Sequence, residues 1–182
     1  MNHFEILTRE NVSAQNQAIF DNLQSKLGFV PNIYATYAYS ENALKTYLDL
    51  QGAKTSLNNK EKEVVNLVVS QVNECTYCLS AHTAIAKVNG FTEEQVLELR
   101  SGTAPFDEKL DALAALAKNL TKNRGNLDEN ILNAFFNAGY TKEHFIDTIV
   151  LVGDKTITNY LHKATKVAID FPLAPSLETS NV

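Results

Sequence analysis

The sequence contains no long run of apolar residues and no excess of basic ones. The apolar stretch from Thr148 to Val152 stops at Gly153, far short of the roughly 18 residues that a membrane-spanning helix requires. Near the N-terminus, Glu5 and Glu10 stand where a signal peptide needs a basic start and an apolar run. The 16 Lys and Arg residues are outnumbered by 21 Asp and Glu residues, and the formal net charge of -5 argues against nucleic acid or an anionic membrane as the main partner. We therefore expect a cytoplasmic protein.

Cysteine is also scarce, since the chain has two, Cys75 and Cys78, separated by two residues. Structural disulfides usually join distant segments, because they stabilise a fold by closing a long loop of the unfolded chain. A bridge between Cys75 and Cys78 would restrain almost nothing. The pair therefore indicates redox chemistry or metal binding in a reducing compartment.

The alternation of apolar and polar residues that is typical of strands is nearly absent, whereas helix caps recur along the chain. We therefore predict an all-α fold. The chain is long enough for one domain with a substantial core, which we place at 1–171, and a polar, aperiodic tail at 172–182 is expected to pack loosely. The predicted helices span residues 13–27, 40–52, 58–72, 74–88, 92–100, 107–122, 128–138 and 142–169, with a connector at 29–32 and a break at Gly153.

The helix predicted at 58–72 precedes the cysteines. Asn58 and Glu61 have the spacing of a capping box at its start. Its apolar residues are largely β-branched, so a strand competes, but the length, the cap and the 3.6-residue spacing favour a helix. Asn73 is predicted to cap the next helix, at 74–88, which places the cysteine pair in a first helical turn.

A weak internal similarity relates two parts of the chain. Sliding the sequence along itself aligns Lys60-Glu61 with Lys142-Glu143 and brings Cys78 opposite Tyr160. Helical apolar patterns resemble one another at many offsets, so two interpretations stay open, a duplicated helical hairpin and a coincidence of period. In the first case only the first copy carries the cysteines.

Cys75 and Cys78 are one helical turn apart, so both sulfurs are expected on one face near the positive end of the helix dipole. This position favours a thiolate, and it lowers the pKa of CxxC thiols from about 8.5 toward neutrality or below. His82 follows Cys78 by four residues and is expected to reach that thiol as base or acid, directly or through one water. Glu63, in the preceding helix, is expected to orient the His82 ring if the two helices pack antiparallel.

The run from Glu63 to His82 reads EVVNLVVSQVNECTYCLSAH and combines a glutamate, twelve residues before the first cysteine, with a CxxCxxxH motif. It resembles the AhpD-type alkylhydroperoxidase and carboxymuconolactone decarboxylase superfamily. The segment from Leu27 to Asn32 and the pair Asn159-Tyr160 resemble the uncharacterised peroxidase-related branch of that superfamily. The similarity extends over roughly residues 15 to 170.

The resemblance implies an AhpD-like helical fold, homo-oligomers that are trimers or hexamers, and reduction of hydroperoxides through a Cys75-Cys78 disulfide. It implies Cys78 as the peroxidatic thiol, Cys75 as the resolving thiol and Glu63 with His82 as the proton relay, with a dithiol or protein thiol as reductant and no metal, haem or flavin. Tyr77 is a departure, since the best-studied members have a second histidine there, and a phenol is a poor base at neutral pH. We predict that Tyr77 packs and does not transfer protons. Lactone decarboxylation is not expected, because members with that activity typically lack the cysteine pair.

Other interpretations of the cysteines stay open: an inert buried pair, a non-enzymatic redox sensor that uses the disulfide as a switch, and a zinc site. Zinc would find three ligands in Cys75, Cys78 and His82, but a closed structural site needs four. His162 is the remaining choice for the fourth ligand and is otherwise interpreted as an ordinary structural histidine.

Oligomerisation is also expected from composition. The segments 34–47 and 135–140 carry more aromatic residues than one small core obviously needs, and exposed aromatic patches usually meet a partner.

Overall fold

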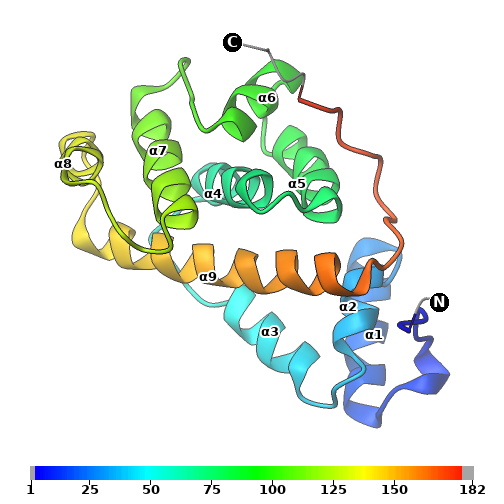
Figure 1. Ribbon diagram of the computed structural model, residues 1–182. Helices are drawn as coiled ribbons and strands as arrows, with labels where there is room; N and C mark the ends of the chain where they lie inside the picture. The colour runs from blue at the N-terminus through cyan, green and yellow to red at the C-terminus, as the bar shows by residue number, and fades with distance from the viewer. Residues whose placement is uncertain (1–2, 178–182) are drawn as a thin grey trace.

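The computed structural model describes residues 3–177, and within this range the chain is helical and has no strand (Figure 1). The helices are η1 (Arg9–Asn11), α1 (Ala14–Leu27), α2 (Asn32–Tyr37), α3 (Ala43–Gln51), α4 (Asn59–Val72), α5 (Thr76–Val88), α6 (Glu93–Ser101), α7 (Glu108–Lys122), α8 (Glu129–Asn137) and α9 (Lys142–Thr165). The all-α prediction is confirmed. The predicted bounds of α1, α4, α6, α7 and α8 differ from the observed ones by no more than one residue at either end.

Helix α4 lies at the centre of one group of helices, with α5, α6, α7 and α9 packed around it (Figure 1). It begins with the predicted capping box, in which Asn58 Oδ1 accepts the N–H of Glu61 and the Glu61 carboxylate accepts the N–H of Asn58. Because α4 is packed on most sides, burial of its β-branched residues outweighs their small loss of helix propensity. Its fully buried apolar residues are Val64, Val65, Leu67, Val68 and Val69.

Helix α9 runs between this group and the helices α2 and α3 on its other side (Figure 1). It is one uninterrupted helix, so the predicted break at Gly153 is wrong. A glycine inside a helix costs only about 1 kcal/mol relative to alanine, and the adjacent Asp154 and Lys155 are fixed in the interior. The helix ends at Thr165, earlier than predicted, because Lys166 adopts a left-handed conformation with φ 54°. The supposed second hairpin is thus a single helix, unlike α4 and α5, and the duplicated hairpin is not observed.

The turn between α4 and α5 also differs from the prediction. Asn73 ends α4 by donating its N–H to the carbonyl of Val69, and it does not cap α5. Glu74 then adopts φ 53°, a left-handed conformation that redirects the chain. Cys75 is the N-cap of α5, and its sulfur accepts the N–H of Cys78 at 3.4 Å. The cysteine pair therefore lies at a helix N-terminus as predicted, with Cys75 at the cap and Cys78 in the first turn.

The segment 29–52 contains a short helix that the sequence prediction missed. Helix α2 begins at Asn32, the last residue of the predicted connector, and continues where no element was predicted; the Pro31 carbonyl accepts the N–H of Tyr34. Proline favours such a start because its fixed φ is already helical. The next helix, predicted from Ser40, begins at Ala43, and the Ser40 hydroxyl accepts the N–H of that residue.

After α9 the chain turns and runs along α5 toward α6 (Figure 1). Asp170 in this segment accepts a hydrogen bond of 2.7 Å from the Tyr77 hydroxyl. Further along, the N–H of Ala174 donates to the Ser80 hydroxyl at 3.1 Å. This hydrogen bond attaches one residue of the predicted tail to α5, Leu173 beside it is 75% exposed, and the remainder of the tail, 178–182, lies outside the described residues.

Most of the aromatic residues that suggested an oligomer lie inside the protein, although Tyr39 is 47% exposed. Tyr37 stacks on Tyr47 with ring centroids 4.4 Å apart, and Phe135 stacks on Tyr140 at the same separation. All four are buried. These four fill the interior of one chain and are not available to an exposed aromatic patch.

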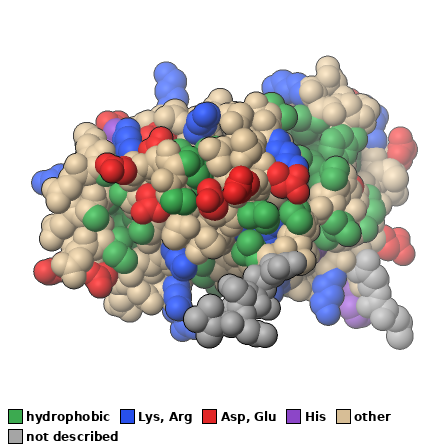
Figure 2. All heavy atoms as spheres, turned by 90° about the horizontal axis from the view of Figure 1, so that it is seen from above, with side chains coloured by type: hydrophobic (Ala, Val, Ile, Leu, Met, Phe, Trp, Pro, Cys, Tyr) green, Lys and Arg blue, Asp and Glu red, His purple; other side chains and the backbone are tan. Residues whose placement is uncertain are grey.

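The surface carries mixed charges. On the face seen in Figure 2, acidic and basic side chains are interspersed among apolar patches, and the coloured residues form no extended basic area in this view. Between residues 3 and 177, no helix is both long enough and apolar enough to cross a membrane.

Candidate active site

The two cysteine sulfurs lie 2.9 Å apart at the N-terminus of α5. Both thiols are free and buried, with 0% of Cys75 and 2% of Cys78 exposed. Because one residue caps the helix and the other lies in its first turn, the local backbone itself holds the sulfurs side by side. A disulfide bond is about 2.0 Å long, so the pair needs only a small approach to close one.

Cys75 is the more acidic of the two thiols. Its pKa is lowered to about 5, first by the hydrogen bond from Cys78, and also by His162, whose Nδ1 lies 3.7 Å from the Cys75 sulfur. The pKa of Cys78 is raised, because its proton is held by the Cys75 sulfur and because the group is buried. The lowered pKa of Cys75 and the raised pKa of Cys78 favour a thiolate at the helix cap and a proton on Cys78.

Glu63 and His82 are in contact, as expected from the sequence. The side chains meet between α4 and α5, where His82 Nδ1 lies 2.8 Å from Glu63 Oε2. Asn66, one turn after Glu63, donates to the other carboxylate oxygen at 2.9 Å. Burial alone would raise the pKa of Glu63, but the His82 ring and the Asn66 amide outweigh it and lower that pKa. The carboxylate is thus held ionised, and it fixes Nδ1 of His82 so that Nε2 is left for other partners.

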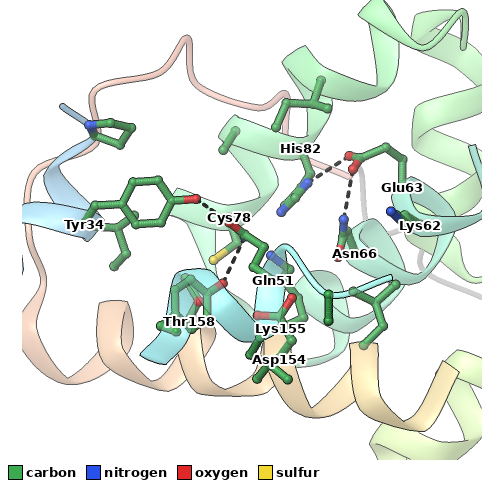
Figure 3. A pocket seen from close by; sticks show the side chains of 18 of the residues that line it. Tyr34, Gln51, Lys62, Glu63, Asn66, Cys78, His82, Asp154, Lys155 and Thr158 are labelled. Atoms are coloured by element: carbon green, nitrogen blue, oxygen red, sulfur yellow. Dashed lines mark hydrogen bonds and ion pairs between the residues drawn. The ribbon is translucent and has the colours of Figure 1, made fainter. Parts of the chain in front are cut away.

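A pocket of about 440 Å³ opens beside these residues (Figure 3). Cys78, His82 and Glu63 line it, whereas Cys75 does not. Much of the remaining wall is aromatic or aliphatic and comes from α1, α2, α3, α5 and α9 and from the segments that follow α1 and α9. It includes Leu27, Phe29, Ile33, Tyr34, Tyr47, Leu50, Ile85, Val150, Leu151 and Phe171. A small molecule in this pocket therefore reaches the sulfur of Cys78 and not that of Cys75.

His82 was expected to reach Cys78 directly or through one water, and the direct hydrogen bond is not present among the described residues. Within the described part of the chain, His82 has its hydrogen bond to Glu63, and Cys78 has its side-chain hydrogen bond to Cys75. The four-residue spacing does place both side chains on the same wall of the pocket (Figure 3). A proton can therefore pass between them through a molecule bound in the pocket.

Tyr77 packs in the interior, in agreement with the prediction. Burial and the neighbouring Asp170, to which its hydroxyl donates, raise the pKa of Tyr77. Its ring lies against Phe171, with centroids 5.7 Å apart, and against His162, at 5.3 Å. The hydroxyl links α5 to the segment after α9 and is not placed to exchange protons with the cysteines.

Helix α9 supplies site residues that the sequence analysis missed. His162 was interpreted as structural, yet it contacts Cys75, and Lys155 and Thr158 line the pocket. Their spacing of three or four residues indicates one helix face. A polar helix face usually points to solvent, so this signal alone does not identify an inward-facing set.

His82 and His162 do not form one cluster with the two cysteines. His82 pairs with Glu63, and His162 lies beside Cys75. Among residues 3–177, no three His, Cys, Asp or Glu side chains are arranged to hold a metal ion.

Residues 40–119 match the model of the carboxymuconolactone decarboxylase family. An uncharacterized peroxidase-related protein from Silicibacter sp. TM1040 is similar in structure, with a TM-score of 0.80, 24% identity and coverage of 92% of this chain and 91% of that one. The alkylhydroperoxidase AhpD core protein from Ralstonia eutropha JMP134, also described as peroxidase-related, has a TM-score of 0.83, 18% identity and coverage of 92% and 91%.

The debrominase Bmp8 also has this fold, with a TM-score of 0.74, 20% identity and coverage of 90% of each chain. Proteins with different reactions therefore share the architecture, and the reaction has to be argued from the site. The matched segment 40–119 contains Glu63, both cysteines and His82. The chain has the AhpD-like fold, and its segment 40–119 matches the model of the carboxymuconolactone decarboxylase family.

Proposed function

We propose that this chain is a thiol-dependent peroxidase or disulfide reductase, which reduces hydroperoxides through a Cys75-Cys78 disulfide. One observation carries the proposal: the sulfurs lie 2.9 Å apart, and only Cys78 lines the pocket that His82 and Glu63 also border. An inert buried pair would need neither a pocket at one sulfur nor a thiolate at the other.

The first step is oxidation of Cys78. Its proton passes to the Cys75 thiolate, which already holds the hydrogen bond between them. The Cys78 thiolate attacks the distal oxygen of ROOH, so that an S–O bond forms, the O–O bond breaks, and the products are Cys78–SOH and RO⁻. His82, oriented by Glu63, delivers a proton to the leaving oxygen and gives ROH.

The second step closes the disulfide. Cys75 returns to its thiolate form and attacks the sulfur of Cys78–SOH, which forms the S–S bond and releases hydroxide. That hydroxide takes up the proton that Cys75 gives up and leaves as water. In sum, one thiolate, one thiol, one proton and ROOH give one disulfide, ROH and H₂O.

The third step is reduction by an external dithiol. Cys75, the expected resolving thiol, is fully buried and does not line the pocket. The accessible sulfur is that of Cys78, so the incoming thiolate attacks there and Cys75 leaves. A thiol of low pKa leaves faster, and the pKa of Cys75, lowered to about 5, suits it to this role.

The test is peroxide consumption with dihydrolipoamide, thioredoxin or glutathione as donor, measured for the wild-type chain and for Cys78→Ser. Repeated turnover with at least one donor that is lost in Cys78→Ser supports the proposal. The alternative, a non-enzymatic redox sensor, consumes one equivalent of peroxide per chain and then stops with every donor. That result, or no loss in Cys78→Ser, would contradict the peroxidase.

A further inference from the structure

Lys155 is a charged side chain in the interior, in the middle of α9, and it lines the pocket (Figure 3). Only 2% of the residue is exposed. The side chain of Lys155 makes no hydrogen bond or ion pair with any residue between 3 and 177, and its Nζ is not among the fully buried atoms that lack a partner, so it keeps access to the pocket. An ammonium that is so little exposed to water is costly unless an acceptor is supplied. The ammonium group therefore lacks an oxygen acceptor among the described residues.

The charge of Lys155 acts on the reacting groups. It lowers the pKa of Glu63 and works against the raised pKa of Cys78. Figure 3 shows the side chains of Lys155, Cys78 and His82 around the same part of the pocket. The ammonium thus borders the space into which a molecule must enter to meet the Cys78 sulfur.

The neighbouring carboxylate does not satisfy Lys155. Asp154 is also buried, and its Oδ1 has no hydrogen-bond partner. Burial raises the pKa of Tyr34 and Tyr47, and the charge of Asp154 adds to both shifts, which places this carboxylate near the tyrosines of the pocket. The carboxylate oxygens of Glu63 already have hydrogen-bond partners in His82 and Asn66, so Glu63 does not pair with Lys155 either.

We propose that Lys155 is a further catalytic residue, which binds the oxygen that leaves when Cys78 attacks a hydroperoxide. This inference rests on the peroxidase function proposed above. In that step the Cys78–O bond forms, the O–O bond breaks, and the electron pair of the broken bond remains on the proximal oxygen. The ammonium donates a hydrogen bond to that oxygen as its negative charge develops, and His82 supplies the proton that makes the alcohol.

The choice of the leaving oxygen follows from the charges in the site. In the resting pair the negative charge already lies on Cys75, which His162 and Cys78 stabilise without Lys155. The charge that lacks a partner is the one that appears on the substrate oxygen during the reaction. A fixed cation at the point where such charge develops is among the largest contributions to catalysis.

The test compares Lys155→Met with Lys155→Arg in the full-length reduced chain, and uses Lys142→Met as the control for loss of a lysine charge at an exposed position of α9. The rate of Cys78 oxidation is measured with hydroperoxides whose leaving groups differ in basicity, an alkyl hydroperoxide and a peroxycarboxylic acid. An alkoxide needs a cation to leave, whereas a carboxylate is stable without one. We expect Lys155→Met to react about 100-fold more slowly than the wild-type chain with the alkyl hydroperoxide. Its rate with the peroxyacid should fall much less.

Lys155→Arg is expected to keep most of the rate, and Lys142→Met all of it. An equal loss with both oxidants, or no loss with either, overturns the role of Lys155 while leaving the peroxidase intact. If the wild-type chain oxidises neither, both proposals fail. Should Lys155→Met not fold, as judged by circular dichroism, Lys155→Gln gives the same comparison with a polar side chain.

Discussion

His162 Nδ1 lies 3.7 Å from the sulfur of Cys75, across 87 positions of the sequence. This contact brings the last helix to the N-terminus of α5 and gives the cap cysteine a partner of its own. Where the resemblance leads one to expect a histidine beside the later cysteine, this chain has Tyr77, which is bound to Asp170. The two cysteines thus have separate surroundings, His162 at Cys75 and the pocket with His82 at Cys78.

The first prediction concerns the acidity of Cys75. Its pKa is lowered to about 5, so the thiolate is present above that pH and is lost below it. Since an unfolded cysteine has a pKa of about 8.5, this ionisation stabilises the fold fully above the unfolded value and progressively less as the pH falls toward 5. Ultraviolet absorbance of the thiolate during a pH titration should show one group titrating near pH 5.

In His162→Gln the midpoint of that titration should move up, because one of the groups that lower the pKa is gone. Cys78→Ser should also move it up, since a serine hydroxyl is a poorer match for the thiolate than the cysteine proton. An unchanged midpoint in His162→Gln would show that the contact has no electrostatic effect.

The second prediction assigns the two cysteines. Cys78 lines the pocket and Cys75 does not, so peroxide should form a sulfenic acid on Cys78. In Cys75→Ser no resolving thiol remains, and a dimedone-type probe should label Cys78. The lower pKa of Cys75 acts in the opposite direction, and labelling of Cys75 in Cys78→Ser, with none in the reciprocal variant, would reverse the roles.

The third prediction concerns Glu63. Glu63→Gln keeps the size and a hydrogen-bonding oxygen for His82 Nδ1 but removes the charge that stabilises a protonated ring. We expect the fold to persist and the peroxidase rate to fall by about 100-fold, the scale of a lost acid-base contribution. Glu94→Gln, at an exposed position of α6, serves as control and should change neither quantity. If Glu63→Gln has the same thermal stability and full activity, Glu63 has no role in proton transfer.

The fourth prediction is self-association through α9. Apolar residues on one side of this helix are exposed, whereas most of the aromatic residues first considered are buried. The exposed residues are Ile146, Ile149, Val150, Ile157 and Tyr160. Light scattering should give the mass of an oligomer for the wild-type chain and a smaller mass for Ile157→Glu. Val88→Glu, at an exposed position of α5, should keep the wild-type mass, and a monomeric wild-type chain would contradict the prediction.

The sequence by itself determined the local features of this protein. The capping box at Asn58, the helical spacing of α4 and the spacing of Cys75, Cys78 and His82 depend on residues within one or two turns, and the structure shows each of them. The contact between Glu63 and His82 could also be predicted from the sequence, because two helices joined by a short turn usually pack antiparallel.

Tertiary structure decided the rest. Whether Asn73 ends one helix or starts the next depends on where the chain must turn, and Glu74 makes that turn in a left-handed conformation. The inward direction of Lys155 and His162 depends on which face of α9 packs against α4 and α5, and residues so distant in sequence leave no local pattern that separates an inward polar face from a solvated one. The pocket at Cys78 exists because α9 joins two groups of helices, and only their packing makes one sulfur accessible and buries the other.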